Sequence, residues 1–165
     1  MPEAARDALA ERAIDFPLEE LPPIDEHGVL VLAEPAAVWS ALLTTLRRSF
    51  SRRSARRYAR LVGCSETEAP GEPDRIGSTG PGFVVARVIE PAVLALEGKH
   101  RFSRYGLVFR LEATKDERTL LRAETRAEFP GILGRIYRLL VIGTRIHVLA
   151  VSSILRRVRR RAERA

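Results

Sequence analysis

The spacing of apolar residues changes twice along the chain and divides it into three parts. Between residues 35 and 63, apolar positions recur every three or four residues, which is typical of amphipathic helices. From residue 84 to residue 129 they alternate with polar positions, which is typical of strands with one buried face. After Pro130 the helical spacing returns and continues to the end. The pattern predicts two helices, then an antiparallel sheet, then a long terminal helix.

The first part begins with a compact apolar run at residues 29–33, which predicts a strand. Pro35 follows it and suits the first position of a helix, and a second helix is predicted over residues 51–63. Residues 65–82 are rich in acids, prolines and glycines and predict a loop. Residues 2–13 can form a further short helix.

The second part consists of alternating runs separated by short turns, which predicts an antiparallel meander with one face in water. Charges of both signs alternate on the predicted wet face, and this favours pairing across strands. The opposite face collects mostly aliphatic and aromatic side chains with a few polar ones. They include Leu94, Leu96, His100, Phe102, Tyr105, Leu107, Phe109, Thr125 and Phe129.

The third part predicts one helix of about thirty residues, which at 1.5 Å per residue is about 45 Å long. Leu140, His147 and Ile154 lie on its apolar stripe. The most apolar stretch, residues 139–155, contains Arg145 and His147, so we do not expect it to span a membrane.

The amino-acid composition limits the class of protein to which the chain can belong. A chain of 165 residues, 45% hydrophobic and 30% charged, predicts one globular domain rather than a disordered segment. Cys64 is the only cysteine, which excludes an internal disulfide framework and fits a reducing compartment. The first twelve residues lack an apolar signal core, so we expect a cytoplasmic protein.

Motifs for cofactors and metals are missing from the sequence. The glycines of residues 77–82 have neither the dinucleotide-binding order nor the lysine of a phosphate-binding loop. His27, His100 and His147 are scattered, and Cys64 has no partner cysteine for a zinc site. We therefore expect no cofactor and no metal. Cys64 is expected to be an ordinary residue at a helix end, although neighbouring arginines could lower the pKa of its thiol.

The net charge of +7 is unevenly distributed. Residues 47–60 contain seven arginines and no acid, and residues 156–165 contain six arginines and one acid. The first 26 residues contain eight acids and two arginines, a local charge of −6. We therefore divide the chain into an acidic arm, residues 1–26, and a single domain, residues 27–165, with a basic C-terminal helix end.

The first arginine block forms one face of its predicted helix, where like charges repel unless an anion lies nearby. Its partner could be the acidic arm, an anionic membrane surface, nucleic acid or the head group of a ligand. Few aromatic residues accompany the arginines, so we do not expect nucleic acid to be the partner. Binding to an anionic surface would use Arg52, Arg53, Arg56, Arg57 and Arg60.

The order of elements resembles the helix-grip fold of the START-like, or SRPBCC, superfamily, which includes polyketide cyclase-like proteins and lipid-transfer domains. The resemblance covers about residues 27–160. It rests on VLVLAEPAAVWSAL at residues 29–42 and on FPGILGRIY at residues 129–137, which is similar to the start of the last helix in some bacterial members of unknown function. It implies an α+β fold in which a curved antiparallel sheet wraps around a long C-terminal helix, with two short helices after the first strand. The acidic arm and the arginine-rich end depart from the minimal pattern.

In such a fold the sheet and the long helix enclose a cavity, so residues on the apolar face become candidate ligand contacts. These are Leu96, His100, Phe102, Tyr105, Phe109, Thr125, Leu140 and His147. The leading hypothesis is binding or transport of a small hydrophobic ligand, lipid-like or polyketide-like, without catalysis. One alternative is a cyclase or dehydratase in which a cavity histidine or tyrosine moves protons. The other is a protein that docks on an anionic membrane or partner through its arginine-rich helices and lies at the membrane periphery.

Overall fold

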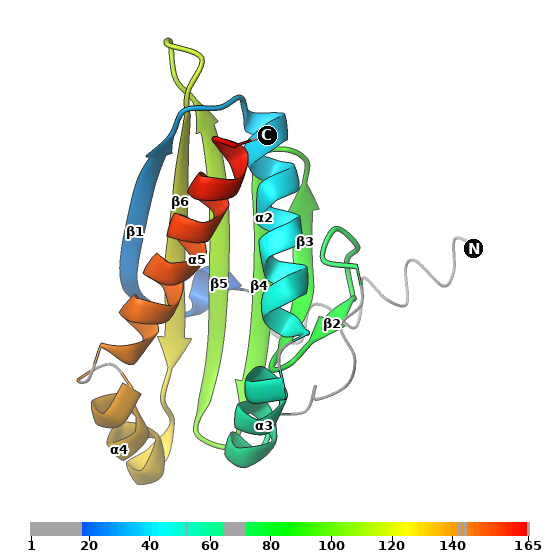
Figure 1. Ribbon diagram of the computed structural model, residues 1–165. Helices are drawn as coiled ribbons and strands as arrows, with labels where there is room; N and C mark the ends of the chain where they lie inside the picture. Colours follow the sequence, from blue (N-terminus) through cyan, green and yellow to red (C-terminus); the bar gives the residue numbers. More distant parts are fainter. Residues whose placement is uncertain (1–17, 52, 65–71, 142, 144, 165) are drawn as a thin grey trace.

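The computed structural model describes residues 18–51, 53–64, 72–141, 143 and 145–164 (Figure 1). Most of the acidic arm, including the helix expected at residues 2–13, lies outside these residues. Described elements of the N-terminal part are a short 3-10 helix η1 (Leu18–Glu20), strand β1 (Pro23–Val31), and helices α2 (Pro35–Phe50) and α3 (Arg53–Val62). The first strand begins at Pro23, within the segment that the sequence assigns to the arm.

The middle of the chain forms the predicted meander. Its strands are β2 (Thr79–Gly80), β3 (Phe83–Ile89), β4 (Val93–His100), β5 (Ser103–Ala113) and β6 (Thr119–Glu128). Together with β1 they make a six-stranded antiparallel sheet in the order β1-β6-β5-β4-β3-β2. The first strand therefore pairs with the last one, which closes the N-terminal strand onto the end of the meander. The short strand β2 lies in the segment predicted to be loop.

The C-terminal part contains two helices rather than one. Helix α4 covers Gly131–Val141 and helix α5 covers Ile146–Ala162. Between them, Gly143 lies in a turn and Arg145 has a left-handed backbone with φ of 56°. The prediction of a continuous helix was wrong here, because an apolar stripe reports which face is buried and not whether the backbone continues. The poor helix propensity of glycine gives the chain a place to break.

One face of the sheet, which we call the inner face, is covered by α2 and α5 (Figure 1). Helix α2 begins at Pro35, as the sequence predicts, and buries Trp39, Leu42 and Leu46. Helix α5 buries Leu155 and Val158 against them. The inner face contributes Leu94, Leu96, Phe109 and Leu121 to the same core. This core fills the space between the two helices and the sheet at the end away from α3 and α4.

The opposite, outer face is only partly wet. Ala95 and Val108 on this face are buried together with Leu18 and Leu21, so the segment around η1 covers part of the sheet. Elsewhere opposite charges pair, as between Arg122 and Glu26 at 3.0 Å. The predicted cross-strand charge pairing is confirmed, whereas the wet face is smaller than predicted. None of the helices in the described part of the chain is long and apolar enough to cross a membrane.

Candidate ligand site

Most polar side chains of the inner face lie at the end of the sheet near α3 and α4. Strand register explains their grouping: Asp25 pairs with Thr125, Thr125 with Leu107, and Tyr105 with Ala127. Because side chains alternate between faces, partners in the register share a face. The alternation in the sequence therefore placed Thr125 and Tyr105 on the correct face.

Aromatic rings gather around His100 at this end of the sheet. The ring centroid of His100 lies 4.8 Å from that of Tyr137 and 5.4 Å from that of Tyr105. The ring of Phe102 stacks on that of Tyr137 with 5.4 Å between their centroids, and the centroid of Phe129 lies 6.4 Å from that of Tyr137. We call these five residues the aromatic cluster. Tyr137 comes from α4, and sequence analysis missed it because it lies beside the apolar stripe rather than on it.

Two residues of the aromatic cluster have polar partners in the backbone. Nδ1 of His100 accepts a hydrogen bond from the backbone N–H of Phe102 at 3.1 Å, and the hydroxyl of Tyr105 donates to the carbonyl of Gly82 at 2.6 Å. Burial lowers the pKa of His100, because removal from water disfavours the charged imidazolium. Burial therefore favours the neutral form of the His100 imidazole. This ring packs against Tyr105 and Tyr137 and accepts the hydrogen bond from Phe102.

Cys64 lies beside Tyr105, with 3.7 Å between its sulfur and the tyrosine hydroxyl. Burial raises the pKa of its thiol, and the hydrogen bond with Tyr105 only partly offsets this. Desolvation thus shifts the pKa of the thiol in the direction opposite to that expected from neighbouring arginines. Cys64 lies two residues after the end of α3, and its role as an ordinary residue at a helix end stays a prediction.

A second group of polar residues lies where α5 begins. Nε2 of His147, from α5, lies 2.6 Å from Oδ2 of Asp25 on β1, and Nε2 of His27 lies 3.2 Å from the same oxygen. His147 and Asp25 are both largely buried, with exposed side-chain fractions of 14% and 19%. The two residues are 122 positions apart in the sequence, so no local sequence pattern could predict their contact. His147 and His100 thus have different neighbours.

Two polar atoms near this pair are buried without a hydrogen-bond partner. They are Oδ1 of Asp25 and Oγ1 of Thr125. These residues lie opposite each other in the register of β1 and β6. Buried polar atoms in folded proteins almost always have partners, so these two atoms are exceptions that require an explanation.

The remaining candidate residues have different surroundings. Leu96 and Phe109 are fully buried in the main core, packed with side chains of α2 and α5. Leu140 is 61% exposed on α4. Contact of Leu96, Phe109 and Leu140 with a ligand stays a prediction.

Of the arginines predicted to bind an anionic surface, Arg53, Arg57 and Arg60 are exposed on α3. Arg52 and the side chain of Arg56 lie outside what the structure describes. Within the described ranges, no group of three or more histidine, cysteine, aspartate or glutamate side chains is arranged to hold a metal ion.

Comparison with solved structures places this architecture among known folds. A conserved protein from Geobacillus kaustophilus aligns over 84% of this chain and 94% of its own, with 18% identity and a TM-score of 0.50. A protein from Chromobacterium violaceum aligns over 86% and 99%, with 12% identity and a TM-score of 0.51. One from Mesorhizobium loti aligns over 86% and 98%, with 13% identity and a TM-score of 0.50. No model of a known protein family matches the sequence, and no curated protein does.

The antiparallel sheet, the two helices after its first strand and the C-terminal helix packed on its inner face make up a helix-grip fold. The α+β helix-grip arrangement that the resemblance implied is thus confirmed as a fold, with the C-terminal segment divided into α4 and α5. At these identities the likeness establishes architecture alone, because one fold supports many functions.

Proposed function

We propose that this protein binds a small hydrophobic ligand on the inner face of the sheet, at the end near α4. The observation that carries the proposal is the pair of buried, unpartnered polar atoms on Asp25 and Thr125. A ligand with one polar group would satisfy them. The aromatic cluster supplies apolar surface on the same end of the inner face, and burial of ligand surface at roughly 25 cal/mol per Å² would provide affinity.

Titration with N-phenyl-1-naphthylamine, a neutral hydrophobic probe that fluoresces in apolar surroundings, tests this proposal. We expect saturable binding of one equivalent and a dissociation constant at least fivefold higher in Tyr137→Ala, which removes the ring stacked on Phe102. Leu133→Ala is the matched control, because this residue is 64% exposed on the same helix. Equal weakening in both variants, or binding that does not saturate, would contradict the proposal.

An enzyme of the cyclase or dehydratase type is a second candidate function. It is supported by the short Asp25–His147 contact, because a carboxylate that orients an imidazole is a common arrangement for a general base. The rings of Tyr105 and His100 would bind the substrate beside it. His147→Gln with retained probe binding and lost turnover of a polyketide-like substrate would favour the enzyme. Unchanged turnover in this variant would exclude His147 as the base.

Docking on an anionic membrane surface is a third candidate, supported by the surface of α4. This helix exposes large apolar side chains and contains exposed arginines but no acid. The apolar residues are Ile132, Leu133, Ile136, Leu139 and Leu140. Helix α3, with Arg53, Arg57 and Arg60, lies at the same end of the molecule (Figure 1). An apolar patch accompanied by cations matches the interface of an anionic bilayer.

Flotation with phosphatidylserine-containing vesicles tests the docking surface. Leu133→Ser combined with Leu139→Ser is expected to reduce the bound fraction several-fold. Leu32→Ser is the control, because Leu32 is 58% exposed at the other end of β1. A bound fraction that is the same in all variants would contradict docking through α4.

A further inference from the structure

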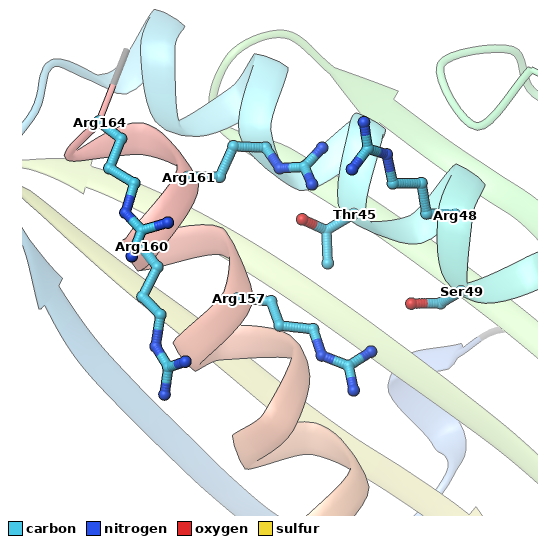
Figure 2. A pocket seen from close by; sticks show the side chains of 7 residues that line it. All are labelled: Thr45, Arg48, Ser49, Arg157, Arg160, Arg161 and Arg164. Atoms are coloured by element: carbon cyan, nitrogen blue, oxygen red, sulfur yellow. The ribbon is translucent and has the colours of Figure 1, made fainter.

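A pocket of about 410 Å³ lies in the groove between α2 and α5 (Figure 2), and none of the residues that line it belongs to the aromatic cluster. Five of the seven residues that line it are arginines: Arg48 from α2, Arg157, Arg160 and Arg161 from α5, and Arg164 from the turn after α5. Thr45 and Ser49 complete the lining on the α2 side. The two arginine blocks of the sequence therefore meet here, since Arg48 belongs to the first block and the others to the second.

Helical geometry explains this convergence. Positions 157, 160 and 161 are spaced by three and four residues and so share one face of α5, and Arg164 follows in the turn after the helix. On α2, Thr45, Arg48 and Ser49 share a face in the same way. Packing of Leu42 and Leu46 with Val158 and Ala162 holds the two helices side by side. The basic pocket is thus built on two helices anchored in the core.

The acid nearest in sequence to these arginines is engaged elsewhere. Oε1 of Glu163 accepts hydrogen bonds from Nε of Arg159 at 2.9 Å and from the backbone N–H of Leu32 at 3.1 Å. The bond from Leu32 is the main reason that the pKa of Glu163 is lowered. In the described part of the chain, no ion pair joins any of the five pocket arginines to a carboxylate. No paired carboxylate among the described residues offsets their mutual repulsion.

Thr45 gives an independent indication of a ligand. Its side chain is buried, with the residue only 3% exposed, and its hydroxyl has no hydrogen-bond partner. Figure 2 shows this hydroxyl directed into the space between α2 and α5, on the side of Arg161. A buried hydroxyl that lacks a partner is unfavourable, and an oxygen-rich ligand in the pocket would offer it one.

We propose that this pocket is a binding site for a compact anion carrying two or three phosphate groups. Each phosphate group contributes a charge of about −1.5 to −2, so two groups offset most of the charge of five guanidinium groups and three groups balance it. Guanidinium is the side-chain group best suited to bidentate phosphate binding, and the Thr45 hydroxyl adds a further donor. The anion could be a soluble polyphosphorylated molecule or a polyphosphorylated lipid head group. This site is separate from the inner face and does not depend on a hydrophobic ligand there.

Isothermal titration calorimetry with inorganic triphosphate in 150 mM NaCl tests the site. We expect one equivalent to bind, and orthophosphate to bind at least tenfold more weakly. Arg157→Gln combined with Arg161→Gln is expected to weaken triphosphate binding at least tenfold. The matched control is Lys115→Gln with Arg118→Gln, which removes the same charge from the exposed turn between β5 and β6 and is expected to change binding less than twofold.

Two outcomes would overturn the proposal: no binding of triphosphate to the natural chain, or equal weakening in the pocket and control variants. Equal weakening would mean attraction to the overall positive charge and not a site. Misfolding is controlled by thermal unfolding without ligand, where the pocket variant is expected to be at least as stable as the natural chain because repulsion is relieved. Thr45→Val is expected to weaken triphosphate binding several-fold without loss of stability.

Vesicle sedimentation then distinguishes the two sources of the anion. Phosphatidylcholine vesicles with phosphatidylinositol 4,5-bisphosphate are compared with phosphatidylserine vesicles of equal surface charge. A lipid head group predicts preferential retention on the first kind and release by free triphosphate. A soluble ligand predicts no preference between the two kinds, with the calorimetric result unchanged.

Discussion

At the residue scale, alternation along the strands carries most of the information about the site. The register confirms that Leu96, Phe109 and Thr125 lie on the inner face, as the two-residue period predicts. Alternation does not show how far along the strand a residue lies. That position decides whether the side chain packs in the core or lies at the polar end of the sheet. Leu96 and Phe109 belong to the first group and Thr125 to the second, and this difference comes from where α2 and α5 lie.

His100 should make the stability of the fold sensitive to pH. Its pKa in the folded state is lowered by burial from the ordinary value of 6.5. As pH falls below this value, the unfolded chain takes up a proton that folded His100 resists, so the free energy of unfolding decreases. Urea unfolding at pH 7.5 and 5.5 should show a larger loss for the natural chain than for His100→Gln. An equal loss in both proteins would contradict the assignment.

At the element scale, the break between α4 and α5 separates two helices that pack in different ways. Helix α5 is anchored in the core through Leu155 and Val158, whereas α4 contacts the aromatic cluster through Tyr137 and exposes most of its large apolar residues. A continuous helix could not change direction at this point. The break therefore decides which apolar residues of the stripe reach the core.

Substitution of Arg145 tests this break. In the left-handed conformation of Arg145, a Cβ atom costs about 1–2 kcal/mol, whereas glycine adopts it freely. Arg145→Gly is thus expected to be more stable than Arg145→Ala by about 1 kcal/mol in urea unfolding. In a continuous helix the order would be reversed, because alanine exceeds glycine by about 1 kcal/mol in a helix interior.

At the scale of the whole molecule, one core joins α2, α5 and the inner face of the sheet. Leu155 is 3% exposed in this core, whereas Leu149, six residues earlier on the same helix, is 64% exposed. Leu155→Ala is expected to lower the free energy of unfolding by about 2–5 kcal/mol, since it leaves a cavity. Leu149→Ala is expected to change it by less than about 0.5 kcal/mol. Similar losses in both variants would show that α5 does not pack on its own sheet as described.

The sequence by itself determined the order of helices and strands, because hydrophobic periodicity and proline placement are local properties that can be recognised without knowledge of contacts. The helix-grip architecture came from the resemblance of that order to a known fold. The sequence also determined the inner-face positions and the two arginine blocks. Only the tertiary structure decided that Asp25 meets His147, that Tyr137 joins His100, and that Arg48 faces Arg157 and Arg161. These contacts join segments far apart in the chain. They depend on how helices cross the sheet and each other, which no local pattern encodes.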